Sequence, residues 1–490
     1  MRPTTRILYR DSRWPALVAV CFGVLMIVLD SSIVNVALPS IRQDFKFTET
    51  SLVWVVNAYM LSFSGSLLLG GRLGDLYGHR RVFLAGIFLF TLASLGCGLA
   101  TTTALLVAAR AVQGLGGAAV VAVALSLIIN MFADGTERAK ALGVYGFVSS
   151  GGGSIGLLLG GVLTSSLSWH WIFLVNLPIG VAVYALCHSL LPKVRASAAD
   201  GRLDNWGAAT VTTSLVLAVY AVVNSTEVAL TSARTLGVLG CSVTLFAVFL
   251  MIEARVSAPL MPLRIFRLRS LSISIAVGVL WSVGTFAWYF TSALYMQVVL
   301  GYGPMQVGLA FLPPNIIQAA FSLGLSSRNI ARFGIKKPIV FGLLLATLGL
   351  VLLAWARVDG GIIKNVLPSM ILLGLGSSIA FNPLLLAAMK DVPPSESGLA
   401  SGIVNTAFMM GGALGLAILA SISVARSNHL LAAGATTSVS LLGGYHLAFL
   451  LGAASVGIAA LIAGIALRVE SHKPIQVQPR GAQVAHDSAV

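Results

Sequence analysis

Two charged residues lie inside apolar stretches of this chain. Asp30 interrupts VLMIVLDSSIVNVALP (residues 24–39), and Arg110 interrupts LLVAARAVQGLGGA (residues 105–118). A charge at the centre of a bilayer costs about 2.5–3.5 kcal/mol on insertion scales, so such residues usually face a cavity and pair with each other. Burial favours a neutral carboxyl group, whereas a nearby guanidinium favours its charged form, and a group held between these influences can bind and release a proton. The two residues therefore indicate proton chemistry at membrane depth.

The depths of the two residues can be compared through the rise of a helix, about 1.5 Å per residue. If helices span residues 14–37 and 104–131, Asp30 lies ~10 Å and Arg110 ~9 Å below the same surface. The two residues therefore lie at similar depth and can pair if their helices are neighbours, and such a pair could couple transport to protons. The alternative is a structural ion pair that only holds two helices together.

The helices that must position these residues follow from composition. The chain of 490 residues is 57% hydrophobic and only 10% charged, whereas soluble domains carry about 25% charged residues. It is therefore expected to be an all-α integral membrane protein. A spanning helix needs about 20 apolar residues, and the sequence predicts fourteen such runs: 14–37, 52–71, 82–101, 104–131, 139–164, 171–191, 206–223, 235–253, 271–297, 306–327, 338–356, 365–389, 399–422 and 444–467.

The basic residues predict the orientation of these spans. With the N-terminal side taken as inside, the inner segments hold 24 of the 31 lysines and arginines, the outer loops hold six, and Arg110 lies within a span. Because cytoplasmic loops are enriched in basic residues, we expect both termini, in tails 1–13 and 468–490, to be cytoplasmic. This distribution also explains the net charge of +15 without a nucleic-acid partner.

The chain also repeats itself at an offset of 256–260 residues. Segment 71–86 aligns with 327–342, so that Arg80-Arg81 meets Lys336-Lys337, and a second match pairs glycines of segments 143–156 and 402–415. Eight predicted spans separate the copies, which therefore share one orientation. Parallel repeats place the substrate path between the halves; chance similarity of glycine-rich spans is the alternative.

Several motifs resemble those of the major facilitator superfamily. GRLGDLYGHRR (71–81) is similar to its signature between helices 2 and 3, and LLVAARAVQGLGGA to its helix 4 signature in proton-driven members. GGGSIGLLLGGVLT (151–164) resembles the exporter signature of helix 5, although Leu157 replaces a proline. LDSSIVNVALP (29–39) and WHWIFLVNLPIG (169–180) resemble the fourteen-helix drug/proton antiporters of the EmrB/QacA group, with His170 in place of an arginine.

The resemblance covers nearly the whole chain and implies a major facilitator fold with fourteen transmembrane helices. Two six-helix bundles, 14–191 and 271–467, would flank two extra helices in 192–270. Helices 1 and 4 are neighbours in that fold, which would bring Asp30 and Arg110 together. The resemblance also implies a cytoplasmic gate formed by Gly71, Arg72, Asp75, Gly78, Arg80 and Arg81. The alternative is that the basic residues only follow the enrichment of positive charge in cytoplasmic loops.

Glycines and aromatic residues give two further predictions. A four-residue spacing of glycines permits close helix packing. The predicted packing residues are Gly152, Gly156 and Gly160. Aromatic rings suit flat apolar cations through cation–π contacts, although interfacial anchoring is the alternative for each ring. The predicted substrate cavity comprises Tyr59, Gln113, Trp281, Trp288, Tyr289, Asn315, Gln318, Asn382 and Phe408.

Together these features predict proton-coupled efflux of amphipathic, cationic drugs or toxic compounds across a bacterial inner membrane. An exporter of an endogenous metabolite or lipid is the alternative. We find no catalytic dyad, no histidine or cysteine spacing typical of a metal site and no GxxxxGK[ST] loop, so neither an enzyme, a metal, a cofactor nor direct ATP use is expected. The expected partners are a small-molecule substrate, protons and the lipid bilayer; a periplasmic adaptor protein is left open.

Overall fold

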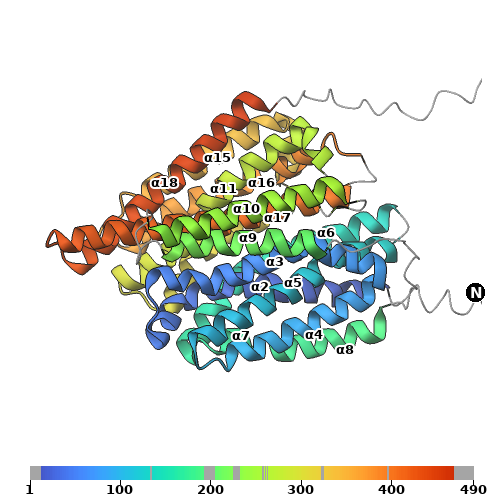
Figure 1. Ribbon diagram of the computed structural model, residues 1–490, viewed down its shortest axis with the longest axis horizontal. Coiled ribbons are helices and arrows are strands. Elements are labelled where there is room, and N and C mark those ends of the chain that lie inside the picture. Colours follow the sequence, from blue (N-terminus) through green and yellow to red (C-terminus); the bar gives the residue numbers. More distant parts are fainter. Residues whose placement is uncertain are drawn as a thin grey trace, which may run out of the picture.

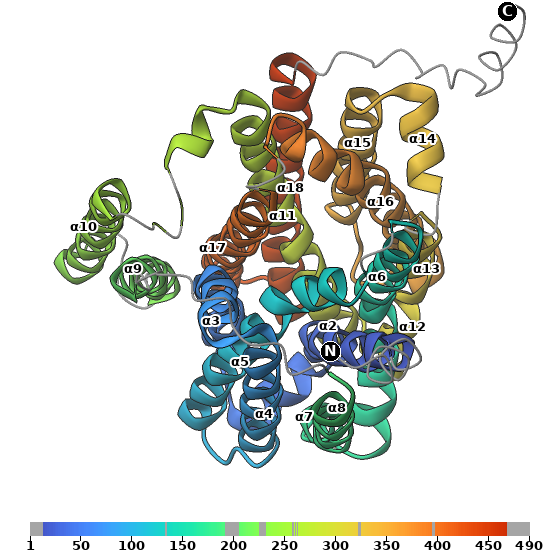
Figure 2. The same cartoon turned by 90° about the vertical axis from the view of Figure 1, so that its right-hand side faces the viewer.

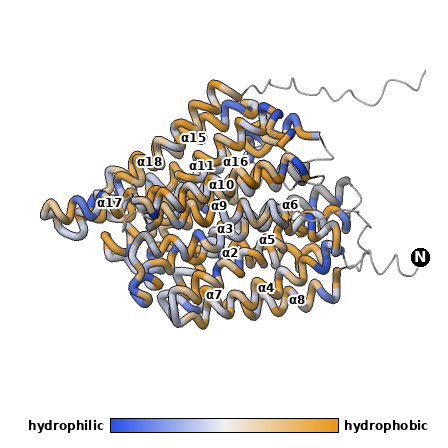
Figure 3. The backbone as a smooth tube through the Cα atoms, viewed as in Figure 1, coloured by the Kyte–Doolittle hydropathy of each residue, from blue (hydrophilic) through white to orange (hydrophobic). Residues whose placement is uncertain are grey.

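Helices make up the computed structural model, which describes residues 13–132, 135–191, 205–224, 232–256, 259, 261, 263–321, 325–393 and 397–467. No strand occurs within these ranges. The predicted tails, 1–13 and 468–490, lie outside the described residues except for Arg13. The helices run roughly side by side along the long axis of the molecule (Figure 1), with their hydrophobic residues concentrated along the helix bodies (Figure 3).

The first group of helices packs around α5. α3 and α4 both pack against α5, and α2 packs against α6 and α8. Glycines allow this proximity: a Cβ placed on Gly116 of α5 would come within 2.9 Å of the Gly86 carbonyl oxygen of α4. The helices of the group are α2 (Arg13–Phe45), α3 (Glu49–Tyr77), α4 (His79–Gly98), α5 (Thr103–Met131), α6 (Gly135–Ser166), α7 (Trp171–Leu174) and α8 (Asn176–Leu190).

A second group repeats this arrangement later in the chain. α15 packs against α16 as α4 packs against α5, and a Cβ on Gly376 of α16 would meet the Gly342 carbonyl oxygen of α15 at 2.5 Å. The group contains η1 (Leu263–Arg267), α11 (Arg269–Leu294), η2 (Tyr295–Val299), α12 (Pro304–Ala310), α13 (Leu312–Ala320), α14 (Ser326–Phe333), α15 (Lys336–Leu353), η4 (Ile362–Val366), α16 (Leu367–Met389), α17 (Ser397–Ala432) and α18 (Thr437–Ala466).

Two further helices lie beside the groups, as Figure 2 shows. α9 (Asn205–Asn224) packs on α3 of the first group and on α17 of the second, and α10 (Ala233–Arg255) packs on α9. Ser214 of α9 and Ser242 of α10 each donate a hydrogen bond to the other's carbonyl oxygen at 2.8 Å. These bonds hold α10, most of whose surface is exposed, against α9.

Within the described residues, eleven helices are long and apolar enough to cross a membrane. Predicted spans 52–71 and 139–164 fall in α3 and α6, whose apolar parts are the shorter segments Ser51–Leu67 and Ile155–Ser166. Predicted span 306–327 is divided at Phe311 between α12 and α13. The protein therefore has many membrane-spanning helices, and the count of fourteen remains a prediction.

Proline explains the division at Phe311. Pro313 and Pro314 occupy the first turn of α13, and proline lacks the N–H group that a continuous helix would need and clashes with the carbonyl of the preceding turn. Another helix is longer than its predicted span. α2 continues to Phe45, beyond the predicted end at residue 37, because backbone hydrogen bonding does not stop where the apolar sequence stops.

The two groups contact each other along α3 and α17, and also at the end of the molecule that is remote from the α3–α4 turn. Gln297 of η2 donates a hydrogen bond from Nε2 to the Val36 carbonyl oxygen of α2 at 2.9 Å. A Cβ on Gly308 of α12 would come within 2.8 Å of the Leu157 carbonyl oxygen of α6. Nearer the middle, Asn57 of α3 donates to the carbonyl oxygen of Ala413 in α17 at 3.0 Å.

Candidate functional site

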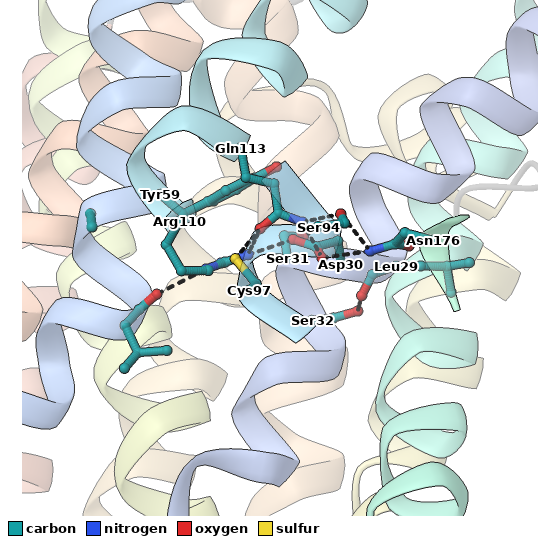
Figure 4. Close-up of polar contacts among 12 residues, drawn as sticks. Leu29, Asp30, Ser31, Ser32, Tyr59, Ser94, Cys97, Arg110, Gln113 and Asn176 are labelled. Atoms are coloured by element: carbon teal, nitrogen blue, oxygen red, sulfur yellow. Dashed lines mark hydrogen bonds and ion pairs between the residues drawn. The ribbon is translucent and has the colours of Figure 1, made fainter. Parts of the chain in front are cut away.

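Asp30 and Arg110 form an ion pair inside the first group of helices. Arg110 Nη1 donates to Asp30 Oδ2 at 2.6 Å, and the side chains are 1% and 0% exposed. α2 carries Asp30 and α5 carries Arg110 (Figure 4). The Thr102 hydroxyl begins α5 by accepting a hydrogen bond from the Leu105 amide at 3.2 Å, which fixes where the arginine lies along the helix.

Two amide side chains complete the surroundings of the carboxylate. Gln113 Nε2 and Asn176 Nδ2 donate to Asp30 Oδ1 at 2.7 and 2.8 Å. The Ser94 hydroxyl oxygen of α4 accepts from the same two amides, at 2.8 and 3.3 Å. Side chains from α2, α4, α5 and α8 therefore form one network around this carboxylate, and each is at most 2% exposed.

The guanidinium group is held from its other side by α3. Arg110 Nε donates to the Val55 carbonyl oxygen at 3.0 Å, and the Tyr59 ring lies 4.3 Å from the guanidinium carbon. Phe173 of α7 contributes a second ring at 5.6 Å. Arg110 Nη1 also donates to Gln113 Oε1 at 2.6 Å. Arg110 thus joins α2, α3, α5 and α7.

Protonation of Asp30 would change the contacts that link α2 to α5. The carboxylate accepts three hydrogen bonds, and hydrogen bonds to charged groups contribute about 1.5–3 kcal/mol each. A proton on Asp30 would remove its negative charge and weaken the link to Arg110. Because a buried charge that loses its partner is unfavourable by several kcal/mol, the freed guanidinium would favour a different arrangement of α2 and α5.

The sequence predicted part of this network. The structure places Asp30 and Arg110 in direct contact, as their similar depth and the family resemblance together predicted, while their role in proton coupling remains a prediction. Tyr59 contacts Arg110 and Gln113 contacts Asp30, and the expected role of both residues in lining a substrate cavity stays a prediction. Asn176 was missed, although it follows the outer end of its span by five residues, ~8 Å, which is close to the depth of the charged pair.

The remaining predicted cavity residues lie on α11 and the helices around it. Trp281 contacts the rings of Phe381 and Phe408, with centroids 5.4 and 6.3 Å away. Two turns along the same helix, Trp288 and Tyr289 contact Phe311, with centroids 6.1 and 5.4 Å away. These rings form two clusters along α11, separated from the Asp30 network by the boundary between the groups.

Polar groups in the two clusters are neutral. The Tyr289 hydroxyl donates to Asn315 Oδ1 at 3.2 Å. The indole N–H groups of Trp281 and Trp288 and the amide N–H group of Asn315 are buried and have no acceptor among the described residues. Gln318 on α13 and Asn382 on α16 are both half-buried. The clusters therefore present aromatic faces together with unused hydrogen-bond donors.

The predicted gate residues surround the turn between α3 and α4. Gly78 ends α3 with φ +94°, a conformation that glycine adopts without strain, and a Cβ on Gly71 would meet nothing within 4 Å. Arg80 donates to the His188 carbonyl oxygen in the last turn of α8. Arg72 is half-buried and Arg81 exposed. The Asp75 side chain lies outside what the structure describes, so the predicted gate network stays a prediction.

The glycine stripe of α6 faces α2. A Cβ on Gly156 would lie 2.7 Å from the Leu29 carbonyl oxygen, and one on Gly160 would lie 2.7 Å from that of Ile33. Gly152 lies against Val28 at 3.0 Å by the same measure. At these three glycines α6 therefore presents bare backbone to the segment of α2 that carries Asp30.

His170, which departs from the motif pattern, lies just before α7. Its ring stacks on Trp169 with centroids 3.7 Å apart, and Trp169 Nε1 donates to Asp44 Oδ2 at 2.9 Å. Burial lowers the pKa of His170, and the Asp44 carboxylate opposes that shift. The site therefore favours a stacked, neutral ring where the motif has a permanent cation.

Comparisons with known proteins agree with this architecture. The family model described as Major Facilitator Superfamily matches residues 20–416. The puromycin resistance protein pur8 of Streptomyces alboniger is 38% identical over 88% of this chain and 86% of its own length, and the cephamycin export protein CmcT of Amycolatopsis lactamdurans is 37% identical over 83% and 84%. The solved structure of PepTSo, a POT family transporter, superposes with a TM-score of 0.68 at 15% identity, covering 92% of this chain and 97% of that one.

Proposed function

Because this chain belongs to the Major Facilitator Superfamily of membrane transporters, we propose that it exports amphipathic compounds in exchange for protons. The observation that carries the proposal is the fully buried ion pair of Asp30 and Arg110. Ionisable residues inside membrane spans commonly belong to proton relays or substrate paths. Within the described spans, Glu253 is the other buried carboxylate, and it lies near the end of α10, three residues before Val256 ends the helix.

Proton exchange requires that Asp30 reach each side of the membrane in turn. In the proposed cycle the halves 14–191 and 271–467 rock against each other, with 192–270 contributing two of fourteen helices. The end closed by Gln297 and Val36 would be the outer one, because basic residues concentrate at the opposite end. Both termini would then be cytoplasmic, in a bacterial inner membrane, and the structure would represent a state closed to the outside.

The proposed substrates combine a flat apolar body, a positive charge and hydrogen-bond acceptors. The ring clusters on α11 support the first two features, because cation–π contacts contribute about 0.5–2 kcal/mol. The unused donors of Trp281, Trp288 and Asn315 support the third, since a buried donor without an acceptor costs about 1–3 kcal/mol. The names of the relatives, a puromycin resistance protein and a cephamycin export protein, support drug efflux generally.

An efflux assay in a host that lacks its own drug pumps tests this proposal. Cells that express the protein are loaded with a planar fluorescent cation such as ethidium, and dye loss is followed with and without a proton uncoupler. We expect efflux that the uncoupler stops. Efflux that continues unchanged after the proton gradient collapses would refute proton coupling, and the absence of efflux across cationic, neutral and anionic compounds would refute drug export.

A further inference from the structure

An apolar groove runs along the membrane-facing side of the first helix group. It lies where α3 and α4 diverge from their connecting turn, and α5 forms its floor. The groove has a volume of about 420 Å³ and is lined by Leu89, Leu115 and Ala119, with Tyr77 and Arg81 at the end near the turn. Leu115 is 41% exposed in the middle of α5, so the groove opens toward lipid.

A second groove occupies the equivalent place in the second group. Its volume is about 380 Å³, and it lies between α14 and α15 with α16 behind them. Phe333 and Lys337 lie at the end near the α14–α15 turn, and Phe341 and Ile379 line the wall. Figure 2 places α14 and α15 at the rim of the molecule, as it does α4 and α5.

The two grooves correspond residue by residue in the internal repeat. An offset of 256 converts Tyr77 to Phe333 and Arg81 to Lys337, and an offset of 260 converts Ala119 to Ile379. The same offsets relate Gly86 and Gly116 to Gly342 and Gly376, whose close packing holds each pair of helices together. Both copies therefore keep an apolar wall, an aromatic ring and a basic side chain at one end.

This pattern suits a lipid with a negative headgroup better than a soluble anion. Long basic side chains extend toward the membrane interface while apolar surface covers their stems, and basic residues near anionic lipid contribute about 1 kcal/mol each. Arg81 and Lys337 are exposed, and neither side chain has an ion-pair or hydrogen-bond partner in the part of the chain that the structure describes. Arg80 and Lys336, their chain neighbours, add positive charge at the same two places.

We propose that each groove binds one anionic phospholipid, with an acyl chain against α5 or α16 and the headgroup on Arg81 or Lys337. The occupant is a membrane lipid because the walls are apolar and face the bilayer, and it is anionic because the polar end of each groove is basic. The groove from Arg81 to Leu89 spans eight residues, ~12 Å, which suits the inner part of an acyl chain. The proposal is independent of what the protein transports.

Native mass spectrometry of the purified full-length protein tests the two sites. The protein is delipidated in detergent and titrated with phosphatidylglycerol or with phosphatidylcholine of the same acyl chains. We expect two phosphatidylglycerol molecules to be retained at collision energies that remove phosphatidylcholine. Arg81→Gln and Lys337→Gln should each lose one retained lipid and the double variant both, whereas Arg255→Gln, at the end of α10 and outside both grooves, should retain two.

A variant that fills a groove but keeps its basic residue distinguishes the contribution of the apolar walls to lipid binding from that of the positive charge. Ala85 lines the first groove and is exposed, so Ala85→Trp should displace one lipid without disturbing the core. Equal retention of the two lipid classes would overturn the proposal. So would two retained lipids in the double variant, unchanged binding in Ala85→Trp, or a second protein copy in place of lipid. None of these readouts depends on transport.

Discussion

The two helix groups share an arrangement but differ in what they bury at equivalent positions. The packing of Gly116 in α5 and Gly376 in α16 aligns these helices at an offset of 260. Arg110 then corresponds to Met370 and Gln113 to Leu373, and all four side chains are at most 2% exposed. The second group therefore has an apolar core where the first has a charged network.

This difference indicates that the charges are not needed to build the fold. Replacing a buried ion pair with apolar side chains of similar volume is often neutral or stabilising, and the second group demonstrates such a core within the same chain. This comparison supports the proposed function of the network around Asp30. The second group instead supplies rings and neutral donors along α11, which suits discrimination between substrates.

Replacing Arg110 with methionine, the residue at the equivalent position of the second group, should have the largest effect on stability. Arg110→Met leaves Asp30 buried without its counter-charge, and breaking a buried pair costs about 3–5 kcal/mol. We expect a clear drop in melting temperature, measured by tryptophan fluorescence in detergent. The double variant Asp30→Asn/Arg110→Met should recover much of the loss.

Met370→Leu in the second group is the matched control, since volume-conserving apolar exchanges cost less than about 1.5 kcal/mol. If Arg110→Met were as stable as Met370→Leu, the two groups would not differ in the way proposed.

The sequence could predict the charged pair because each charge in an apolar span demands a partner, helix rise gives its depth, and the family resemblance makes the two helices neighbours. It could not predict which neutral residues complete the network. Asn176, Ser94 and Gln113 are single polar residues in apolar segments, and only the packing of their helices decides which face turns inward. The contacts of Tyr59 and Gln113 with the charged pair were therefore not predicted, and their assignment to a substrate cavity remains a prediction.

The two asparagines next to the functional clusters should behave differently. Asn176→Ala removes one of three hydrogen bonds to the Asp30 carboxylate, a contribution of about 1.5–3 kcal/mol. It should therefore alter the pH dependence of transport. Asn315→Ala removes a neutral partner of Tyr289 and should change the KM for substrates without changing that pH dependence.

Initial transport rates measured in vesicles across a range of pH and substrate concentrations separate the two effects. Identical behaviour of both variants would count against a division of labour between the halves.

Alanine substitutions at packed glycines of the two helix groups should differ in stability by the smallest amount. A Cβ on Gly156 of α6 would press on the Ser32 hydroxyl and on the Leu29 carbonyl oxygen, whereas the atoms nearest to one on Gly415, its repeat equivalent in α17, all belong to the Val283 side chain. Overpacking typically costs about 1–3 kcal/mol, so Gly156→Ala should destabilise more than Gly415→Ala.

Melting temperatures compare the two alanine variants directly. Gly153→Ala is the control, because a Cβ there would meet nothing within 4 Å. A larger loss in Gly415→Ala than in Gly156→Ala would show that α2 tolerates movement beside Asp30.

Most of the helical architecture was also readable from the sequence, because apolar length marks a span. Pro313 and Pro314 mark the break at Phe311 in the sequence, but the span 306–327 was predicted from apolar length alone and so runs across it. The clusters around Trp281 and Trp288 could be predicted as aromatic but not as two separate groups, because Phe381, Phe408 and Phe311 come from helices distant in sequence.

The central claim, that Asp30 exchanges protons for substrate, is tested most directly with Asp30→Asn in proteoliposomes. Asparagine keeps the shape and neutral hydrogen bonds of the carboxyl group but cannot titrate. We expect the variant to fold, to bind substrate and to catalyse substrate exchange at equal concentrations across the membrane, yet to fail to accumulate substrate when a pH gradient is imposed. Accumulation at the wild-type level under that gradient would contradict the account.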